Sequence, residues 1–157
     1  MVDLDKVLDL IRAMNREGVE YITFGAIALW THGIVRNTED ADFFVAPTPE
    51  NIERLKRALR SVWNDPNIDE IDAEELIGDY PAVRYGPPDT DLYMDFLTRL
   101  GEAYSYGTLQ WQIAEVEGVP IRVVTPLQLY AMKRNTVRLK DRNDAEALRQ
   151  AFSLPED

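Results

Sequence analysis

Short runs of β-branched and aromatic residues alternate along this chain with longer segments of helical periodicity. The runs that predict strands are residues 20–24, 42–46, 82–85, 92–97, 113–116 and 119–124. The segments that predict helices are residues 3–16, 26–32, 48–63, 125–137 and a last one capped by Asp141. This alternation restricts the chain to the α/β (α+β) class, with helices interleaved among five or six strands.

Two of the predicted helices share a start signature, a threonine followed by proline. Thr48-Pro49 and Thr125-Pro126 each place a hydroxyl at the N-cap and a proline at the first helical position. In the second helix, Gln128 completes a capping-box pattern. The acidic segment 64–80 is weakly patterned, and it predicts only a short strand near Ile68 and a turn of helix at 73–77.

Length and composition exclude several classes of protein. At 157 residues we expect one domain, residues 1–157, with a core at about 20–124 and a helical C-terminal part at about 125–153. The absence of cysteine excludes a disulfide scaffold, a thiolate nucleophile and a cysteine zinc site. The single histidine, His32, excludes a metal site made of histidines alone and argues against a Ser-His-Asp triad.

The charge balance restricts the partners. Asp and Glu total 28 against 17 Lys and Arg, a formal net charge of −11. Such a chain is repelled on average by phosphate backbones and anionic membranes, so we expect neither extensive non-specific nucleic-acid binding nor a membrane partner. The longest charge-free stretch, residues 21–35, is shorter than the roughly 20 residues that span a bilayer. With no signal-peptide pattern at the start, the sequence predicts a cytoplasmic protein.

One segment carries the chemistry. Phe24-Gly25-Ala26 is followed, after thirteen residues, by Asp40-Ala41-Asp42-Phe43. Residues two apart on a strand share a face, so Asp40 and Asp42 project together and repel unless a cation lies between them. Their oxygen ligands suit Mg²⁺ or Mn²⁺. Gly25 lies at a strand-to-helix turn, where backbone N–H groups can approach a phosphate. These features together indicate phosphoryl transfer.

The same residues resemble the nucleotidyltransferase superfamily of the DNA polymerase β type. Its signature is a hydrophobic residue, Gly, then Gly or Ser, nine to thirteen residues, and Asp-x-Asp; here Ala26 stands at the Gly/Ser position. Residues 25–45 are similar to the small prokaryotic branch that includes AbiEii-type abortive-infection toxins, and residues 115–148 resemble the C-terminal part of that branch. The resemblance implies a mixed β-sheet flanked by helices, with further helices at the C-terminus.

The resemblance also implies a third carboxylate on a neighbouring strand. Asp95 fits because apolar residues flank it within a strand pattern, where an aspartate is costly to bury without a partner such as a metal. Asp89 and Asp91 compete for the role, but their surroundings are typical of turn residues. The expected catalytic and metal-binding residues are therefore Asp40, Asp42 and Asp95, on strands that we expect to be adjacent.

The residues expected to bind nucleotide by resemblance are Gly25, Ala26, Arg36, Thr38, Lys133 and Lys140. Two alternatives remain open. Arg36 and Thr38 could orient their loop or pair with Asp40 instead. Lys133 lies in an apolar helical stretch and could merely extend its ammonium to solvent; we expect it to turn inward, beside Lys140, Arg36 and Arg138. His32 is expected to be a hydrogen-bonded helix end.

The implied activity is the transfer of NMP from an NTP to an acceptor hydroxyl of tRNA, a protein or a small molecule. Mg²⁺ or Mn²⁺ would be the cofactor, and a small cognate protein would be the partner in a toxin–antitoxin system. The alternative is a protein that keeps the fold with little or no turnover and acts as a binding or antitoxin-like partner.

Overall fold

The computed structural model describes residues 3–35, 40–134 and 136–155 of the chain. Its centre is a six-stranded mixed sheet of order β3-β4-β2-β1-β8-β7. The strands are β1 (Tyr21–Phe24), β2 (Asp40–Val45), β3 (Ala82–Tyr85), β4 (Tyr93–Leu97), β7 (Trp111–Val116) and β8 (Val119–Val124). The predicted fold class is confirmed, and the strands predicted at 20–24, 42–46 and 92–97 are neighbours.

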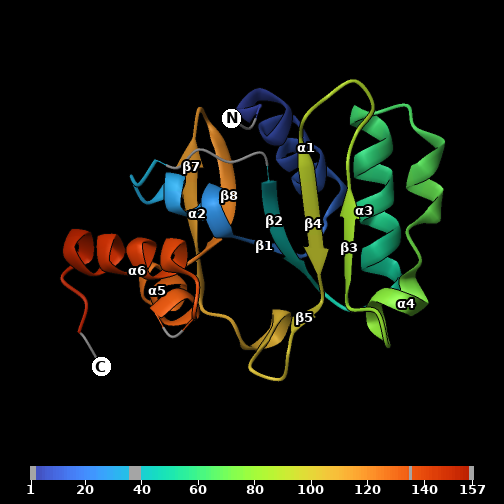
Figure 1. The fold of residues 1–157 in the computed structure, drawn as a ribbon. Helices are drawn as coiled ribbons and strands as arrows, with labels where there is room; N and C mark the ends of the chain where they lie inside the picture. Colours follow the sequence, from blue (N-terminus) through green and yellow to red (C-terminus); the bar gives the residue numbers. More distant parts are fainter. Residues whose placement is uncertain (1–2, 36–39, 135, 156–157) are drawn as a thin grey trace.

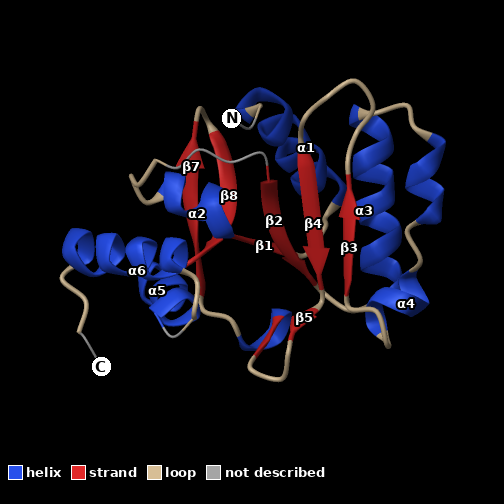
Figure 2. Ribbon diagram, in the orientation of Figure 1, coloured by secondary structure: helices blue, strands red, loops and turns tan. Residues whose placement is uncertain are grey.

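Helices cover both faces of the sheet (Figures 1 and 2). One face carries α1 (Leu4–Glu17), α3 (Pro49–Val62) and α4 (Ala73–Ile77), and the other carries α2 (Gly25–Thr31), α5 (Pro126–Arg134) and α6 (Leu139–Phe152). Because side chains alternate along a strand, neighbouring residues enter different cores. Phe43 packs with α1 and α3, whereas Phe44 packs with α2 and the C-terminal helices.

The predicted helix starts are confirmed, one of them only in part. The Thr48 hydroxyl accepts a hydrogen bond from the Asn51 amide at 3.1 Å, and the Thr125 hydroxyl accepts one from the Gln128 amide at 3.1 Å. The Gln128 side chain does not complete a capping box. It instead accepts a hydrogen bond from the Gln110 amide, which ties the start of α5 to the segment before β7.

Three local predictions were wrong. The strand near Ile68 is a 3₁₀ helix, Pro66–Glu70, because Pro66 sets a helical φ and the Asp65 carboxylate caps the Asn67 amide. The last helix begins at Leu139 without a side-chain cap. Asp141 lies in its first turn, where ion pairs occupy the carboxylate. Helix α5 ends at Arg134, earlier than the predicted Val137.

Two short elements near the sheet carried no sequence signal. Strands β5 (Arg99–Leu100) and β6 (Tyr104–Ser105) form a small separate sheet, followed by a 3₁₀ turn at Tyr106–Thr108. Two-residue strands are too short to show a period of two. Among the described helices, none has both the length and the apolar character needed to cross a membrane.

Candidate active site

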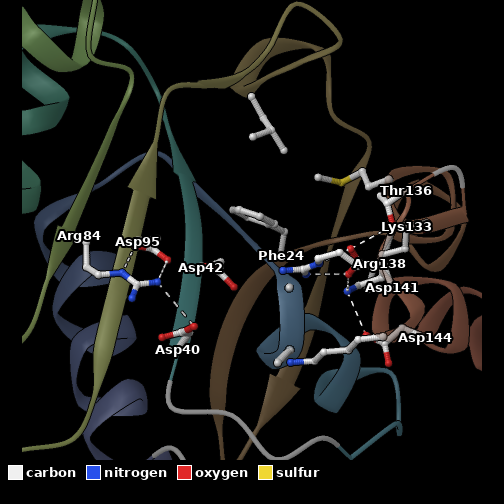
Figure 3. A pocket seen from close by; sticks show the side chains of 16 residues that line it. Phe24, Asp40, Asp42, Arg84, Asp95, Lys133, Thr136, Arg138, Asp141 and Asp144 are labelled. Atoms are coloured by element: carbon white, nitrogen blue, oxygen red, sulfur yellow. Dashed lines mark hydrogen bonds and ion pairs between the residues drawn. The ribbon is translucent and has the colours of Figure 1, made fainter.

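The three predicted carboxylates share one face of the sheet. In the register of the strands, Phe24 pairs with Asp42, Asp42 with Asp95, and Asp95 with Arg84. These four side chains form a cross-sheet row over β1, β2, β4 and β3, and Asp40 lies on the same face two residues before Asp42 (Figure 3). The pairing of β2 with β4 therefore brings together aspartates that are far apart in the sequence.

The row borders a cavity of about 350 Å³. Its other walls come from the start of α2 and from the two C-terminal helices. Seven of the predicted site residues line it, namely Gly25, Ala26, Asp40, Asp42, Asp95, Lys133 and Lys140, together with Arg138. Arg36 and Thr38 lie outside the described residues. The sheet side of the cavity thus carries three carboxylates and Arg84, and the side of α5 and α6 carries three cations together with Asp141 and Asp144.

The surroundings of Asp42 disfavour the ionised form of its carboxyl. Burial, followed by the neighbouring carboxylates of Asp95 and Asp40, raises the pKa of Asp42 to about 7. A carboxyl in such surroundings either keeps its proton near neutral pH or takes a cation as partner. Carboxylates that bind a metal ion lie this close together, because the ion offsets their mutual repulsion.

Gly25 allows Asp42 to reach this position. Its φ is +69°, and a Cβ built on it would lie 2.2 Å from the Asp42 Oδ2 atom. No side chain fits in that space, and the left-handed φ disfavours one independently. A glycine is therefore required at position 25 for a steric reason, in addition to any need for a phosphate to approach the backbone.

We expect Gly25→Ala to destabilise the protein by about 1–3 kcal/mol more than Gly18→Ala, as a Cβ forced into a packed site does. Gly18 is a matched control because its φ is +73° and nothing lies within 4 Å of the position that its Cβ would take. Urea unfolding of both variants measures the difference. Equal losses would mean that only the backbone angle matters and that Asp42 moves at no cost.

Arg84 is a site residue that the sequence interpretation missed. Its guanidinium donates two hydrogen bonds to Asp95, from Nε to Oδ1 at 2.9 Å and from NH2 to Oδ2 at 3.0 Å. The same NH2 lies 3.7 Å from Asp40 Oδ2. The available signal was the position of residues 82–85 directly before the turn into the strand of Asp95, which favours pairing of the two strands.

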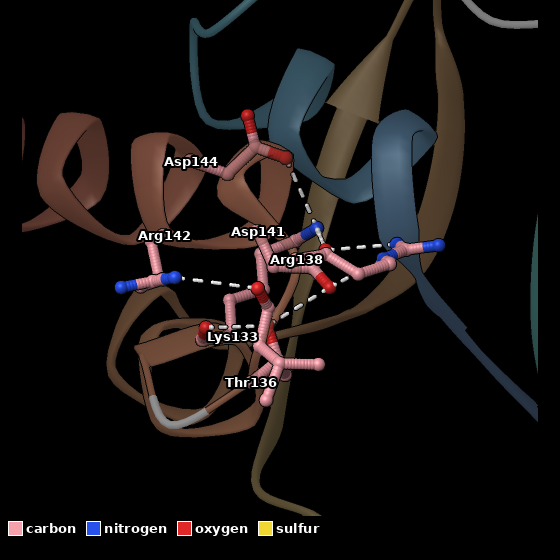
Figure 4. Close-up of polar contacts among 7 residues, drawn as sticks. Lys133, Thr136, Arg138, Asp141, Arg142 and Asp144 are labelled. Atoms are coloured by element: carbon pink, nitrogen blue, oxygen red, sulfur yellow. Dashed lines mark hydrogen bonds and ion pairs between the residues drawn. The ribbon is translucent and has the colours of Figure 1, made fainter.

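Lys133 is turned inward, as predicted, and does not extend to solvent. Its side chain is 12% exposed, and its Nζ lies 3.2 Å from Asp141 Oδ1 and 3.1 Å from Asp144 Oδ2 (Figure 4). Arg138 binds Asp141 with two hydrogen bonds of 2.8 and 2.9 Å and thereby holds the pKa of that carboxyl well below its usual range. The contacts between α5 and α6 thus form a fixed ionic wall of the cavity.

His32 has a structural position outside this set. Its Nε2 lies 2.8 Å from the carbonyl oxygen of Val124, and its ring packs edge-on against Phe152. Burial lowers the pKa of His32, which favours a neutral ring that donates to the carbonyl. This agrees with the expected helix-end role.

The donor set suits a hard divalent ion. Three carboxylates on one sheet face provide the oxygen ligands that Mg²⁺ and Mn²⁺ prefer. Within the described ranges, no three acidic or histidine side chains converge on a single point suited to an ion. Arg84 engages Asp95, which directs that carboxylate toward β3. The residues fit the ion in number and chemistry, with a rearrangement of Asp95.

One protein-family model matches this chain. A family model described as nucleotidyl transferase AbiEii toxin, type IV toxin–antitoxin system, matches residues 25–148. No curated protein matches the sequence.

Similar solved structures show the same fold. ANT(2'')-Ia in complex with adenylyl-2''-tobramycin has a TM-score of 0.58 at 12% identity, over 95% of this chain and 88% of that one. A Thermotoga maritima protein, TM1012, provisionally assigned as a nucleotidyltransferase, has a TM-score of 0.54 at 13% identity, over 98% and 96%. The solution structure of the antibiotic-resistance factor ANT(2'')-Ia has a TM-score of 0.51 at 17% identity, over 98% and 93%.

Proposed function

The chain belongs to the AbiEii nucleotidyl transferase toxin family, and we propose that it transfers NMP from an NTP to an acceptor hydroxyl with the help of Mg²⁺ or Mn²⁺. One observation carries the proposal. Asp40, Asp42 and Asp95 face a cavity whose opposite wall carries three cations, Lys133, Arg138 and Lys140, alongside Asp141 and Asp144. A triphosphate needs both a metal held by carboxylates and fixed positive charge, and residues that could supply both line this cavity.

In this proposal the carboxylates divide the work. Asp40 and Asp42 would hold the ion, and Asp95 would orient the acceptor hydroxyl, whose oxygen forms a bond to the α-phosphorus in line with the bond to pyrophosphate that breaks. The bound ions would neutralise the charge that develops on phosphate and lower the pKa of the acceptor hydroxyl. The amides of Gly25 and Ala26, at the cavity wall, are proposed to donate to the terminal phosphates.

Lys133 is proposed to stabilise phosphate charge from the opposite wall. Two of its three N–H donors face Asp141 and Asp144, so among the contacts of the described residues one donor is left for a phosphate oxygen. The two carboxylates also fix the direction of the ammonium, which preorganises it for charge that develops during transfer. Lys140 is exposed at the cavity and is proposed to meet the substrate at its mouth. Arg36 and Thr38 remain predictions.

We also propose that residues 1–157 act as one domain, because α5 and α6 share a hydrophobic cluster with the sheet and supply one wall of the cavity. The partner is proposed to be a small cognate antitoxin, in accord with the type IV toxin–antitoxin description of the family. The proposed acceptor is a hydroxyl of tRNA, a protein or a small molecule, and the proposed compartment is the cytoplasm.

A second candidate is a binding protein of the same fold with little turnover. The observation that favours it is the engagement of both Asp95 oxygens by Arg84, which already neutralises the third carboxylate without an ion. The alanine at position 26 points the same way, since it lacks the hydroxyl that a serine offers to phosphate.

Binding of the nucleotide with its metal tests the proposal. At concentrations about 100-fold above the dissociation constant, Mn²⁺ and an NTP together should raise the melting temperature by about 5–10 °C. Either one alone should raise it less, because the proposed ion bridges carboxylates and triphosphate. Differential scanning fluorimetry with each of the four NTPs measures the shift and reports the base preference.

The double variant Asp40→Asn/Asp42→Asn is the control, and it should stay folded while losing the joint shift. A wild-type protein that binds NTP equally well with Mn²⁺ and with EDTA would contradict the proposed metal site. A shift without any labelling of cell extract by α-³²P-labelled NTP would favour the second candidate.

A further inference from the structure

Arg84 is placed where a cation would be needed to bind Asp95. Its guanidinium meets both oxygens of the Asp95 carboxylate and lies within 4 Å of Asp40. It reaches them from β3, which pairs with β4 on the side away from Asp42. The Asp95 carboxylate therefore has Arg84 on one side and the carboxylates of Asp42 and Asp40 on the other (Figure 3).

We propose that Arg84 is a positioning residue that substitutes for a divalent ion at Asp95 and must leave before Asp95 can coordinate one. The inference rests on the proposed function, since it assumes that Asp40, Asp42 and Asp95 form the metal site. The inference adds Arg84 to the proposed site. It also adds a step, in which a divalent ion replaces the guanidinium at Asp95.

The bidentate geometry makes the two partners compete for the Asp95 carboxylate. Both Asp95 oxygens accept from the guanidinium, and the approach of a second cation to the same oxygens would place two positive charges side by side. An arginine does not lose its proton to resolve that conflict. It has to move, and the exchange is therefore conformational.

The surroundings of Arg84 permit that movement. Its side chain is 53% exposed, so the ion pair is of the solvent-accessible, readily broken kind. Its guanidinium carbon already lies 5.2 Å from the centre of the Tyr93 ring, a cation–π contact that can hold the arginine after release. Arg84, Asp42 and Asp95 also border a second cavity of about 480 Å³ with Val83 and Leu97, which gives the side chain room.

A purely structural interpretation treats the contact as an ordinary cross-strand ion pair. It predicts that loss of Arg84 weakens the edge of the sheet and leaves metal affinity unchanged. The two interpretations differ in the affinity of the nucleotide-free protein for Mn²⁺, a quantity that requires no knowledge of the acceptor.

The test is a Mn²⁺ titration of the full chain. Binding is monitored by calorimetry and by the electron paramagnetic resonance signal of free Mn²⁺. Because exposed ion pairs contribute modestly, we expect Arg84→Gln to raise Mn²⁺ affinity about 3- to 10-fold. Arg84→Lys keeps the charge and should stay within about twofold of wild type. Arg57→Gln is the matched control, with a side chain that is 54% exposed and paired with Glu17, and it should leave the affinity unchanged.

The Asp95→Asn background separates competition from a general change in the electrostatic field. There, Arg84→Gln should give less than a twofold gain, because the carboxylate that the two cations share is gone. A gain that persists in Asp95→Asn overturns the inference, and so does an unchanged or lowered affinity in Arg84→Gln. If Mn²⁺ binding depends on Asp42 but not on Arg84, only the inference fails. If the wild-type protein binds no Mn²⁺, the proposed function fails with it.

Discussion

The Asp42→Asn variant is expected to lose nucleotidyl transfer while its metal-free form becomes more stable. Removal of a proposed ligand of the ion that would stabilise charge in the transition state should lower the transfer rate on the order of 10³-fold. Pyrophosphate release and labelling of cell extract by α-³²P-labelled NTP measure the loss. The fold should persist because asparagine fills nearly the same volume at the same place in β2.

The gain in stability should depend on pH in a defined direction. The Asp42 carboxyl has an ordinary pKa of 3.8, which the folded protein raises to about 7. The folded protein therefore holds this proton more tightly than the unfolded chain, so the stability that it contributes is present below pH 4 and is lost as the pH rises through 7. Asp42→Asn escapes that loss, and above pH 7 it should exceed wild type by about 2–4 kcal/mol in EDTA.

Urea unfolding between pH 4.5 and 8.5 with EDTA checks this expectation. Asp9→Asn is the matched control, because Asp9 is a surface aspartate on α1 paired only with Arg12 among the described contacts. If the free energy of unfolding depends on pH in the same way for wild type and Asp42→Asn, the pKa of the Asp42 carboxyl is not raised in the folded protein. If activity survives in Asp42→Asn, the proposed metal site is wrong.

Lys133→Ala is expected to damage the fold as well as nucleotide binding. Its ammonium lies between Asp141 and Asp144, and the Asp144 side chain is only 1% exposed. Removal of one partner leaves buried negative charge, which should cost about 2–4 kcal/mol of stability, below the full cost of an isolated buried charge because Arg138 still covers Asp141. Nucleotide affinity should fall in addition, by about 1.5–3 kcal/mol.

Lys56→Ala is the control for this prediction. The Lys56 side chain is 11% exposed, close to the 12% of Lys133, but the one partner described for its ammonium is the exposed Glu53 at 3.8 Å. It should therefore cost clearly less stability and leave nucleotide affinity unchanged. Chemical unfolding and calorimetry with Mg²⁺ and NTP separate the two effects. Full stability of Lys133→Ala would mean that the ion pairs with α6 contribute nothing net.

The sequence predicted the site best where chemistry and local periodicity coincide. The strand pattern around Asp42 and the apolar flanks of Asp95 placed both on strands, and the resemblance to the nucleotidyltransferase superfamily implied that those strands meet. The reason that Gly25 is required was only half visible, since the approach of Asp42 to its backbone is a contact across two strands. Capping signals at Thr48 and Thr125 were reliable because they act within four residues.

The sequence failed where a side chain had two local options and a distant partner decided between them. Asp141 has the residue type of an N-cap, but Lys133 and Arg138 offer charge-assisted bonds that a cap does not match. For Arg84 the sequence indicated only that residues 82–85 could pair with the strand of Asp95, because its contact with Asp95 comes from the register of β3 against β4. Such contacts depend on pairing, and pairing is set by the whole sheet.

The order in which β2, β4 and α6 are synthesised determines when the proposed site can form. Strand β2 cannot present Asp42 beside Asp95 until β4 has been synthesised, because the two strands pair only after α3, α4 and β3 have intervened. The ionic wall comes later still and is incomplete until Asp144 is added. Domains fold as units once their sequence has emerged. A chain that stops before β4 would therefore lack the proposed trio of carboxylates, and one that stops before Asp144 would lack the completed ionic wall.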